Sequence, residues 1–245
     1  MTHHSIGISG STILSDPKKF TYLFNKKYVK HIEIGEFSNQ DAFKTFLNEH
    51  NRHGLTFGLH SPLYRNQSKY DLLEKVHYDS EESWIQFEKE VKHMSELGAE
   101  YILVHFPYFK EESERDSNTL IDNGLKKLQV LQEKYNIPIV CEPKLGLNRS
   151  SVGIDALHDF PVETWDKYNI KLCIDIGDYL MSAGSQTIEY IKKWEKYILV
   201  VHLHNVEYIG DDYFWIPVHP SQEENPNYYT IQDLIIQLMT QVSHP

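Results

Sequence analysis

Short apolar runs alternate with helical patterns along almost the whole chain. The runs are rich in β-branched residues, which is typical of strands buried on both faces of a parallel sheet. They are SIGIS (5–9), KHIEIG (30–35), LTFGLH (55–60), YILVHF (101–106), IPIVCE (137–142), KLCIDIG (171–177) and YILVVHLHN (197–205). Because strands that alternate with helices form parallel sheets with crossover helices, the pattern predicts an α/β fold.

Apolar residues between the runs recur at helical spacing. The clearest helices are predicted over 80–97, where Gly98 provides a stop, over 117–135, and from Thr230 onward. A TIM-type barrel and a doubly wound sheet both fit, but SIGISGST lacks the full dinucleotide fingerprint of the latter. We therefore expect a single TIM-type barrel domain over residues 1–245.

Only seven strand candidates precede the last residues, QVSHP, where an eighth strand would be expected to begin. The expected barrel therefore lacks its eighth strand in this chain. A shortened chain and a natural seven-stranded variant remain alternatives.

Composition narrows the class of protein. The chain has 245 residues, 40% hydrophobic and 24% charged, with a formal net charge of −11. This negative charge does not favour non-specific binding to nucleic acid. No apolar run is long enough to span a membrane. Without a recognisable signal peptide, and with only Cys141 and Cys173, interpreted as buried reduced thiols, we expect a cytoplasmic protein.

Metal-capable side chains stand where five consecutive predicted strands end. They are His60, His105, Glu142, Asp175 and, on the last of these strands, His202 with His204. In a parallel barrel these strand ends gather at one face, where active sites lie. Imidazole and carboxylate groups suit Zn²⁺, Mn²⁺ or Fe²⁺, and a cation would explain a carboxylate at the end of so apolar a run as 137–142.

Each of these residues also has a simpler interpretation. A lone histidine at a strand end is usually hydrogen-bonded or solvated, and a lone aspartate usually organises a loop. The recurrence of such residues at the same structural place favours a metal site over a set of unrelated structural residues.

The ordered motifs HSP, VHFP, CEPKLG, CIDIGD and VHLHN resemble the xylose isomerase-like TIM barrel superfamily. This group includes sugar isomerases and epimerases and the endonuclease IV type of apurinic endonuclease. The resemblance implies that His60, His105 and Glu142 stand where the endonucleases hold one zinc. It also implies that Glu142, Asp175 and His202, or His204 in its place, stand at the metal shared by the whole superfamily.

Departures from the family pattern are equally informative. Asp178 replaces the usual histidine after the sixth strand, and Tyr213 and Trp215 stand at two further ligand positions of the endonucleases. A third metal site is therefore not expected. The glutamate that the superfamily carries on its eighth strand, half of the acid–base pair in sugar epimerases, has no counterpart before the chain ends.

Other side chains near the expected mouth are candidates for substrate binding. Tyr64 and Arg65 follow the third strand, Lys144 and Arg149 follow the fifth, and Trp215 could pack on a sugar ring. Solvation at the surface is the alternative for the first four, and a place in the core is the alternative for Trp215.

The resemblance implies a metal-dependent isomerase or epimerase of a sugar or sugar phosphate, with one or two Zn²⁺ or Mn²⁺ ions. The metal would acidify a C–H bond beside a carbonyl, Glu142 would move the proton, and Asp178 would hold a substrate hydroxyl. The alternatives are an endonuclease IV-like phosphodiesterase, for which nucleic acid is a less favoured partner, and a non-catalytic relative that binds metal or sugar.

Overall fold

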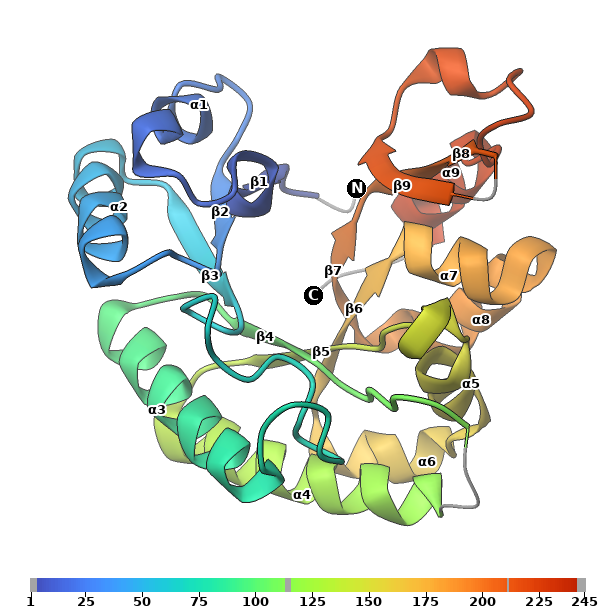
Figure 1. Cartoon of the computed structure of the whole chain (residues 1–245), viewed down its shortest axis with the longest axis horizontal. Coiled ribbons are helices and arrows are strands. Elements are labelled where there is room, and N and C mark those ends of the chain that lie inside the picture. The colour runs from blue at the N-terminus through green and yellow to red at the C-terminus, as the bar shows by residue number, and fades with distance from the viewer. Residues whose placement is uncertain (1–3, 113–115, 211, 242–245) are drawn as a thin grey trace. The chain divides into compact units, whose positions relative to one another are not determined.

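The computed structural model describes residues 4–112, 116–210 and 212–241. Its main sheet has seven strands, labelled in Figure 1. They are β1 (Gly7–Ser9), β2 (His31–Ile34), β3 (Thr56–His60), β4 (Ile102–His105), β5 (Ile139–Glu142), β6 (Lys171–Asp175) and β7 (Ile198–His202). Each lies within a run predicted as a strand, so the prediction of an α/β fold is confirmed.

The order of the strands in the sheet follows their order in the chain, from β1 to β7. The pairs β1–β2, β2–β3, β3–β4 and β6–β7 are parallel. A doubly wound sheet reverses its strand order at a switch point, whereas a barrel adds each strand beside the previous one. The sequential order is therefore that of a TIM-type barrel.

Nine α-helices are found in the described residues. They are α1 (Thr21–Phe24), α2 (Gln40–His53), α3 (Ser80–Leu97), α4 (Ser117–Tyr135), α5 (Val152–Asp159), α6 (Val162–Trp165), α7 (Ile176–Ala183), α8 (Thr187–Trp194) and α9 (Gln232–Gln241). The predictions over 80–97 and 117–135 agree with α3 and α4. None of these described helices has the length and apolar character required to cross a membrane.

Contacts divide the chain into two compact units, and the division passes through α4 and β5. The N-terminal unit contains residues 4–105 and 123–140, and the C-terminal unit contains the other described residues, from 106–122 and 141–241. Each unit is described by itself below.

Helix α2 covers β2 and β3 in the N-terminal unit (Figure 1). It begins where the Asn39 side chain accepts a hydrogen bond from Ala42 N at 2.9 Å, and it ends at Gly54, whose φ of 65° suits glycine. Its buried Phe46 packs on Phe57 of β3 with ring centroids 6.0 Å apart. This packing fixes the outer side of the strands that carry the site.

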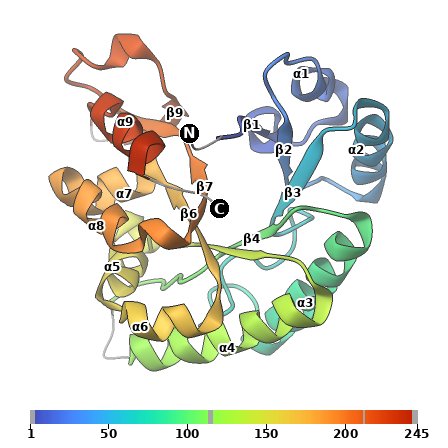
Figure 2. The same ribbon diagram turned by 180° about the vertical axis from the view of Figure 1, so that it is seen from behind.

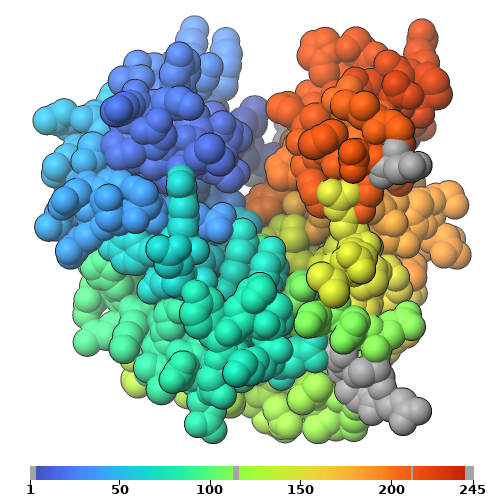
Figure 3. Space-filling view, in the orientation of Figure 1, coloured from blue at the N-terminus to red at the C-terminus, as the bar shows by residue number. Residues whose placement is uncertain are grey.

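An ordered segment, residues 61–79, joins β3 to α3 and fills the surface drawn in teal in Figure 3. The buried Asp71 organises it by accepting hydrogen bonds from the backbone N–H groups of Val76, His77 and Tyr78 and from Ser68 Oγ. Burial opposes the charge, but these donors together hold the pKa of Asp71 below its ordinary value.

Helices α7, α8 and α9 of the C-terminal unit, labelled with β6 and β7 in Figure 2, share one apolar cluster of side chains with these two strands. The cluster is made of large aliphatic and aromatic side chains, among them Ile174, Tyr179, Ile191, Ile198 and Leu234. Helix α7 follows β6 without a loop, and Asp175 is its N-cap. The side chains at the end of β6 are therefore held by both a strand and a helix.

The seventh apolar run does not form one strand, which corrects the prediction over 197–205. The chain leaves the parallel sheet at Leu203, which is 50% exposed, and β8 (His204–Ile209) pairs in antiparallel fashion with β9 (Asp212–Pro217). After this hairpin comes α9, and the described residues contain no eighth strand of the parallel sheet. The expected absence of an eighth strand refers partly to residues 242–245, which lie outside the described residues.

Candidate functional site

Two histidines meet at the ends of neighbouring strands in the N-terminal unit. His60 ends β3 and His105 ends β4, and their Nε2 atoms lie 2.8 Å apart with the rings edge-on. His105 is buried, and Tyr70 from the segment after β3 stacks on its ring with centroids 4.9 Å apart. Adjacent parallel strands thus bring these two residues together, as the sequence predicted.

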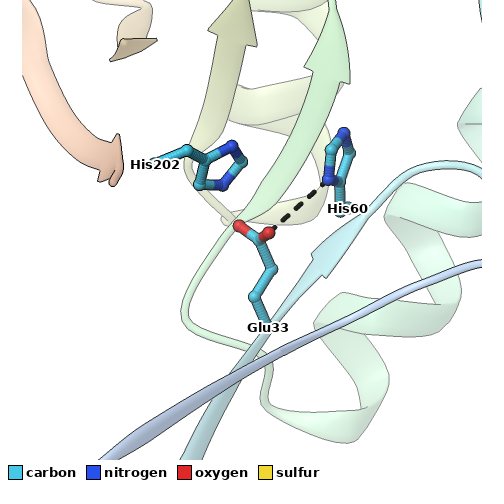
Figure 4. Close-up of side chains that lie close together, drawn as sticks. All are labelled: Glu33, His60 and His202. Atoms are coloured by element: carbon cyan, nitrogen blue, oxygen red, sulfur yellow. Dashed lines mark ion pairs between the residues drawn. The ribbon is translucent and has the colours of Figure 1, made fainter. Parts of the chain in front are cut away.

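Glu33 extends this pair on the side of β2. Its Oε1 lies 3.5 Å from His60 Nδ1, the ion pair marked by the dashed line in Figure 4, and its Oε2 accepts a hydrogen bond from Tyr101 Oη at 3.0 Å. Glu33 is 5% exposed in the middle of an apolar strand. Sequence analysis missed this residue, although a carboxylate within the run KHIEIG is the same signal that singled out Glu142.

Glu142 lies at the end of β5 in the C-terminal unit and has no solvent exposure. Its Oε1 is 3.1 Å from Nδ1 of His202, which ends β7, and 3.4 Å from Nζ of Lys144. The carboxylate at the end of IPIVC does not point into water. It lies between the His202 imidazole and the Lys144 ammonium group, and these contacts offset the cost of burying its charge.

Lys144 is the centre of a buried cluster of charges. Its Nζ lies 3.4 Å from Asp175 Oδ2 and in closer contact with Asp178 Oδ2, in addition to Glu142. Its side chain is 17% exposed, so the interpretation of Lys144 as a solvated surface residue is wrong. Three carboxylates therefore share one ammonium group.

The cluster separates the pKa values of its aspartates. Burial alone would raise the pKa of Asp175, but the Lys144 ammonium and His204 hold it well below its ordinary range. Burial, together with the Asp175 and Glu142 carboxylates, raises the pKa of Asp178 to about 6 against the opposing effect of the Lys144 ammonium. Asp178 can consequently gain or lose a proton near neutral pH, which is a property of acid–base residues.

Trp215 contacts Asp178, and Arg149 packs on the aromatic rings of Tyr213 and Trp215. Trp215 Nε1 donates a hydrogen bond to Asp178 Oδ1 at 3.0 Å, and the Arg149 guanidinium lies 3.2 Å from the centre of the Tyr213 ring. A side chain at Gly177 would approach Trp215 Cδ1 to 2.8 Å, so glycine is needed for this close contact. The two positions that the resemblance aligns with endonuclease ligands thus carry a tryptophan that hydrogen-bonds to Asp178 and a tyrosine that contacts the Arg149 guanidinium.

His204 belongs to β8 and does not share a strand with His202. The prediction that both histidines lie on one strand over 197–205 is therefore wrong, because the chain changes sheets at Leu203. Their rings nevertheless lie 6.2 Å apart, and His204 Nδ1 is 3.5 Å from Asp175 Oδ2. His202 contacts Glu142 and His204 contacts Asp175, so each histidine has its own carboxylate.

Tyr64 and Arg65 lie in the N-terminal unit, which contains a pocket of about 110 Å³. Arg65 lines the pocket and donates from Nε to Glu36 O at 2.9 Å and from a terminal nitrogen to Leu14 O. His60 and several serines are also part of the lining. Arg65 joins the segments that follow β1, β2 and β3, and its role in substrate binding stays a prediction.

A compact set of metal-capable atoms lies within the C-terminal unit. One atom each from Glu142, Cys173 and His202 lie within 4.8 Å of one another. Carboxylate, thiolate and imidazole are all ligands that divalent ions accept, so the donor chemistry fits a metal. Cys173 was not predicted as a ligand, although it stands two residues before Asp175 and so on the same side of β6. That the sets of the two units form one site stays a prediction.

Several solved structures are similar to this chain in fold. A 3-keto-D-glucoside 4-epimerase, YcjR, from E. coli has a TM-score of 0.58 at 13% identity, covering 81% of this chain and 78% of the epimerase chain. A D-psicose 3-epimerase solved in the presence of D-fructose has a TM-score of 0.54 at 15% identity, covering 82% and 72%. A xylose isomerase-like TIM barrel protein from Mycobacterium smegmatis, in complex with magnesium, has a TM-score of 0.62 at 12% identity, covering 99% and 90%.

A comparison with curated proteins gives no match. The family model described as xylose isomerase-like TIM barrel matches residues 20–225, which include β2 to β9. The resemblance carried by the strand-end motifs is therefore confirmed, and the chain belongs to the xylose isomerase-like TIM barrel family.

Proposed function

We propose that this protein is a metal-dependent isomerase or epimerase that moves a proton next to the carbonyl of a sugar or sugar phosphate. The observation that carries the proposal is the buried cluster of Glu142, Asp175 and Asp178 around Lys144, beside His202. Neighbours of similar fold are named as sugar epimerases, which supports the same class of substrate.

Glu142 and His202 are the residues that would hold the metal, and the resemblance implies Asp175 as a third ligand. When bound, a divalent ion supplies positive charge that acidifies a C–H bond beside a carbonyl. The protein's own task is then to accept that proton and return it to the other face of the carbon or to the neighbouring atom.

Two carboxyl groups are suited to this proton transfer. Glu142 is the base that the family resemblance implies, and Asp178 has a pKa near 6, so it can act in either direction near neutral pH. Two fixed contacts orient the Asp178 carboxyl group, since Oδ1 accepts from Trp215 Nε1 and Oδ2 contacts Lys144. Asp178 thereby becomes a second candidate for the acid–base role, besides its predicted contact with a substrate hydroxyl.

The test is solvent exchange. The full chain is freed of metal with a chelator, reloaded with Mn²⁺, Zn²⁺ or Mg²⁺, and incubated in D₂O with a panel of ketoses, aldoses and their phosphates. Loss of a C–H signal by NMR is expected with at least one sugar, and Glu142→Gln should slow it by about 10²-fold or more. Cys141→Ser is a matched control, since Cys141 is the neighbouring buried residue on the same strand.

A phosphodiesterase of the endonuclease IV type is the second candidate, and the contact of His60 with His105 favours it. Against it stand the net charge of −11 and the replacement of two ligand positions by Tyr213 and Trp215. Metal-dependent nicking of abasic duplex DNA would reverse our ordering. Metal binding with neither exchange nor nicking would identify a non-catalytic relative.

A further inference from the structure

The metal-capable set of the C-terminal unit includes a sulfur atom. The Cys173 thiol, the Glu142 carboxylate and the Nδ1 or Nε2 of His202 come from β6, β5 and β7, and their ligand atoms lie within 4.8 Å of one another. Around a tetrahedral Zn²⁺ such atoms are about 3.4–3.6 Å apart. Movements of about an ångström, within the range of side-chain rotation, would therefore place all three on one ion.

The direction of the two cysteines distinguishes them. Side chains alternate along a strand, so Cys141 faces away from its neighbour Glu142, whereas Cys173 shares the side of Asp175. Asp175 lies opposite His202 in the register of β6 and β7. The side of β6 that carries Asp175 and Cys173 is therefore the side on which β7 carries His202. Both thiols are fully buried, so exposure does not separate them but orientation does.

Lys144 changes which oxygen ligands are accessible to a metal. Its ammonium lies 3.4 Å from both Asp175 Oδ2 and Glu142 Oε1 and contacts Asp178 more closely, and Glu142 Oε1 also lies 3.1 Å from His202 Nδ1. A divalent ion that used the carboxylates alone would have to displace this tethered cation from them. An ion bound by Glu142 and His202 could instead recruit a neutral thiol, which loses its proton to solvent as the sulfur binds.

We infer that Cys173 is a metal ligand, together with Glu142 and His202, and that it makes the site prefer a thiophilic ion such as Zn²⁺ over Mg²⁺. This inference builds on the proposed metal-dependent function and narrows the class of metal. The physical reason for the preference is ligand softness, since thiolate sulfur binds Zn²⁺ or Co²⁺ strongly and Mg²⁺ poorly. The alternative is a cysteine that acts only as a small apolar side chain in the core.

Titration with Co²⁺ tests the inference without any assay of activity. Metal-free full-length protein is titrated with Co²⁺, because a thiolate bound to Co²⁺ gives an intense charge-transfer band in the near ultraviolet and oxygen or nitrogen ligands do not. We expect the band in the wild type and in Cys141→Ser, and its loss in Cys173→Ser together with a fall of at least about tenfold in Zn²⁺ affinity. Zn²⁺ should abolish the band, whereas about a hundredfold excess of Mg²⁺ should leave it in place.

The wild-type spectrum alone can overturn the inference, so the outcome does not depend on the folding of a variant. Wild-type protein that binds Co²⁺ without the near-ultraviolet band would overturn it, and so would wild-type protein that does not bind Co²⁺. A band that is lost in Cys141→Ser but kept in Cys173→Ser would also overturn it. Solvent exchange into a sugar by protein that binds Co²⁺ without the band would leave the proposed function standing and remove Cys173 from the site. The band without any exchange would support the ligand and count against the function.

Discussion

Glu90 provides a sharp test of the electrostatics that hold the site in place. It lies on α3 and is 5% exposed, with Oε2 accepting from Ser61 Oγ at 2.6 Å and Oε1 accepting from Leu63 N at 3.1 Å and Gln86 Nε2 at 3.2 Å. These contacts anchor the segment that directly follows His60. Burial raises the pKa of Glu90 from 4.5 to about 7, although all three hydrogen bonds favour the charged form.

The direction in which the free energy of unfolding changes with pH depends on whether the folded or the unfolded chain binds the Glu90 proton more tightly. Well below pH 4.5 the Glu90 carboxyl group is protonated in both the folded and the unfolded chain, so it makes the free energy of unfolding neither rise nor fall with pH. Between pH 4.5 and about 7 the unfolded chain gives up this proton while the folded chain keeps it, so the free energy of unfolding falls as the pH rises. Because one pKa unit corresponds to about 1.4 kcal/mol, the full loss is about 3 kcal/mol and is complete above the folded-state pKa.

Glu90→Gln keeps the shape and can donate an N–H to Ser61 while its oxygen accepts from Leu63, so it imitates the protonated acid. The free energy of unfolding in urea, followed by tryptophan fluorescence, is compared between variant and wild type at about pH 5 and about pH 8. We expect the difference to shift in favour of the variant by about 2–3 kcal/mol over this range. Glu96→Gln, on an exposed position of the same helix, should show no such shift.

A difference between Glu90→Gln and wild type that is the same at both pH values would refute the reasoning. So would a difference that moves in favour of the wild type as the pH rises. Either result would mean that Glu90 is ionised in the folded chain throughout this range, and that burial does not govern its pKa.

Two further predictions concern the cluster in the C-terminal unit. Lys144→Gln leaves the buried carboxylates of Glu142, Asp175 and Asp178 without their ammonium partner, so the metal-free variant should lose about 3–5 kcal/mol of stability, and added Mn²⁺ should restore part of it. Thermal unfolding with and without Mn²⁺ measures this, and a variant as stable as the wild type without metal would contradict it. If Asp178 carries the proton as its carboxylate, solvent exchange should rise with pH through about 6, and Asp178→Asn should remove this limb of the profile. An unchanged profile in Asp178→Asn would assign the limb to another group.

The strands and the metal-capable residues at their ends could be predicted because a parallel sheet requires a recognisable pattern in the sequence. Strands buried on both faces need unbroken apolar runs, and a histidine or carboxylate at the end of such a run is conspicuous. His60, His105, Glu142 and Asp175 were found in this way, and the structure places each at the end of its strand.

The position of Lys144 could not be read from the sequence, because it depends on the path of a loop. The Lys144 N–H bonds to Pro107 O at 3.4 Å, and Gly146 passes so close to Phe109 O that a Cβ would lie 2.6 Å from it. These contacts join segments far apart in the chain. No local pattern distinguishes a lysine turned inward by them from one in water.

The end of β7 was missed for a related reason. VVHLHN continues the alternation of apolar and polar residues, and alternation indicates extended backbone without saying which sheet it joins. The partner of β8 is β9, whose residues 212–217 could not be assigned to it from the alternation alone. Glu90 illustrates the same limit on a helix, since its burial depends on Ser61 and Leu63 in a distant segment.

The ammonium of Lys144 also affects the order in which the protein folds and binds its metal. A cluster of acids that required a metal for neutrality could close only around that metal, and the chain would have to find an ion while it folded. Here the chain brings a positive charge of its own to Glu142, Asp175 and Asp178. These acids can therefore be buried while the chain folds without a metal. Metal binding then becomes a later step, and the bound ion can exchange with ions in solution.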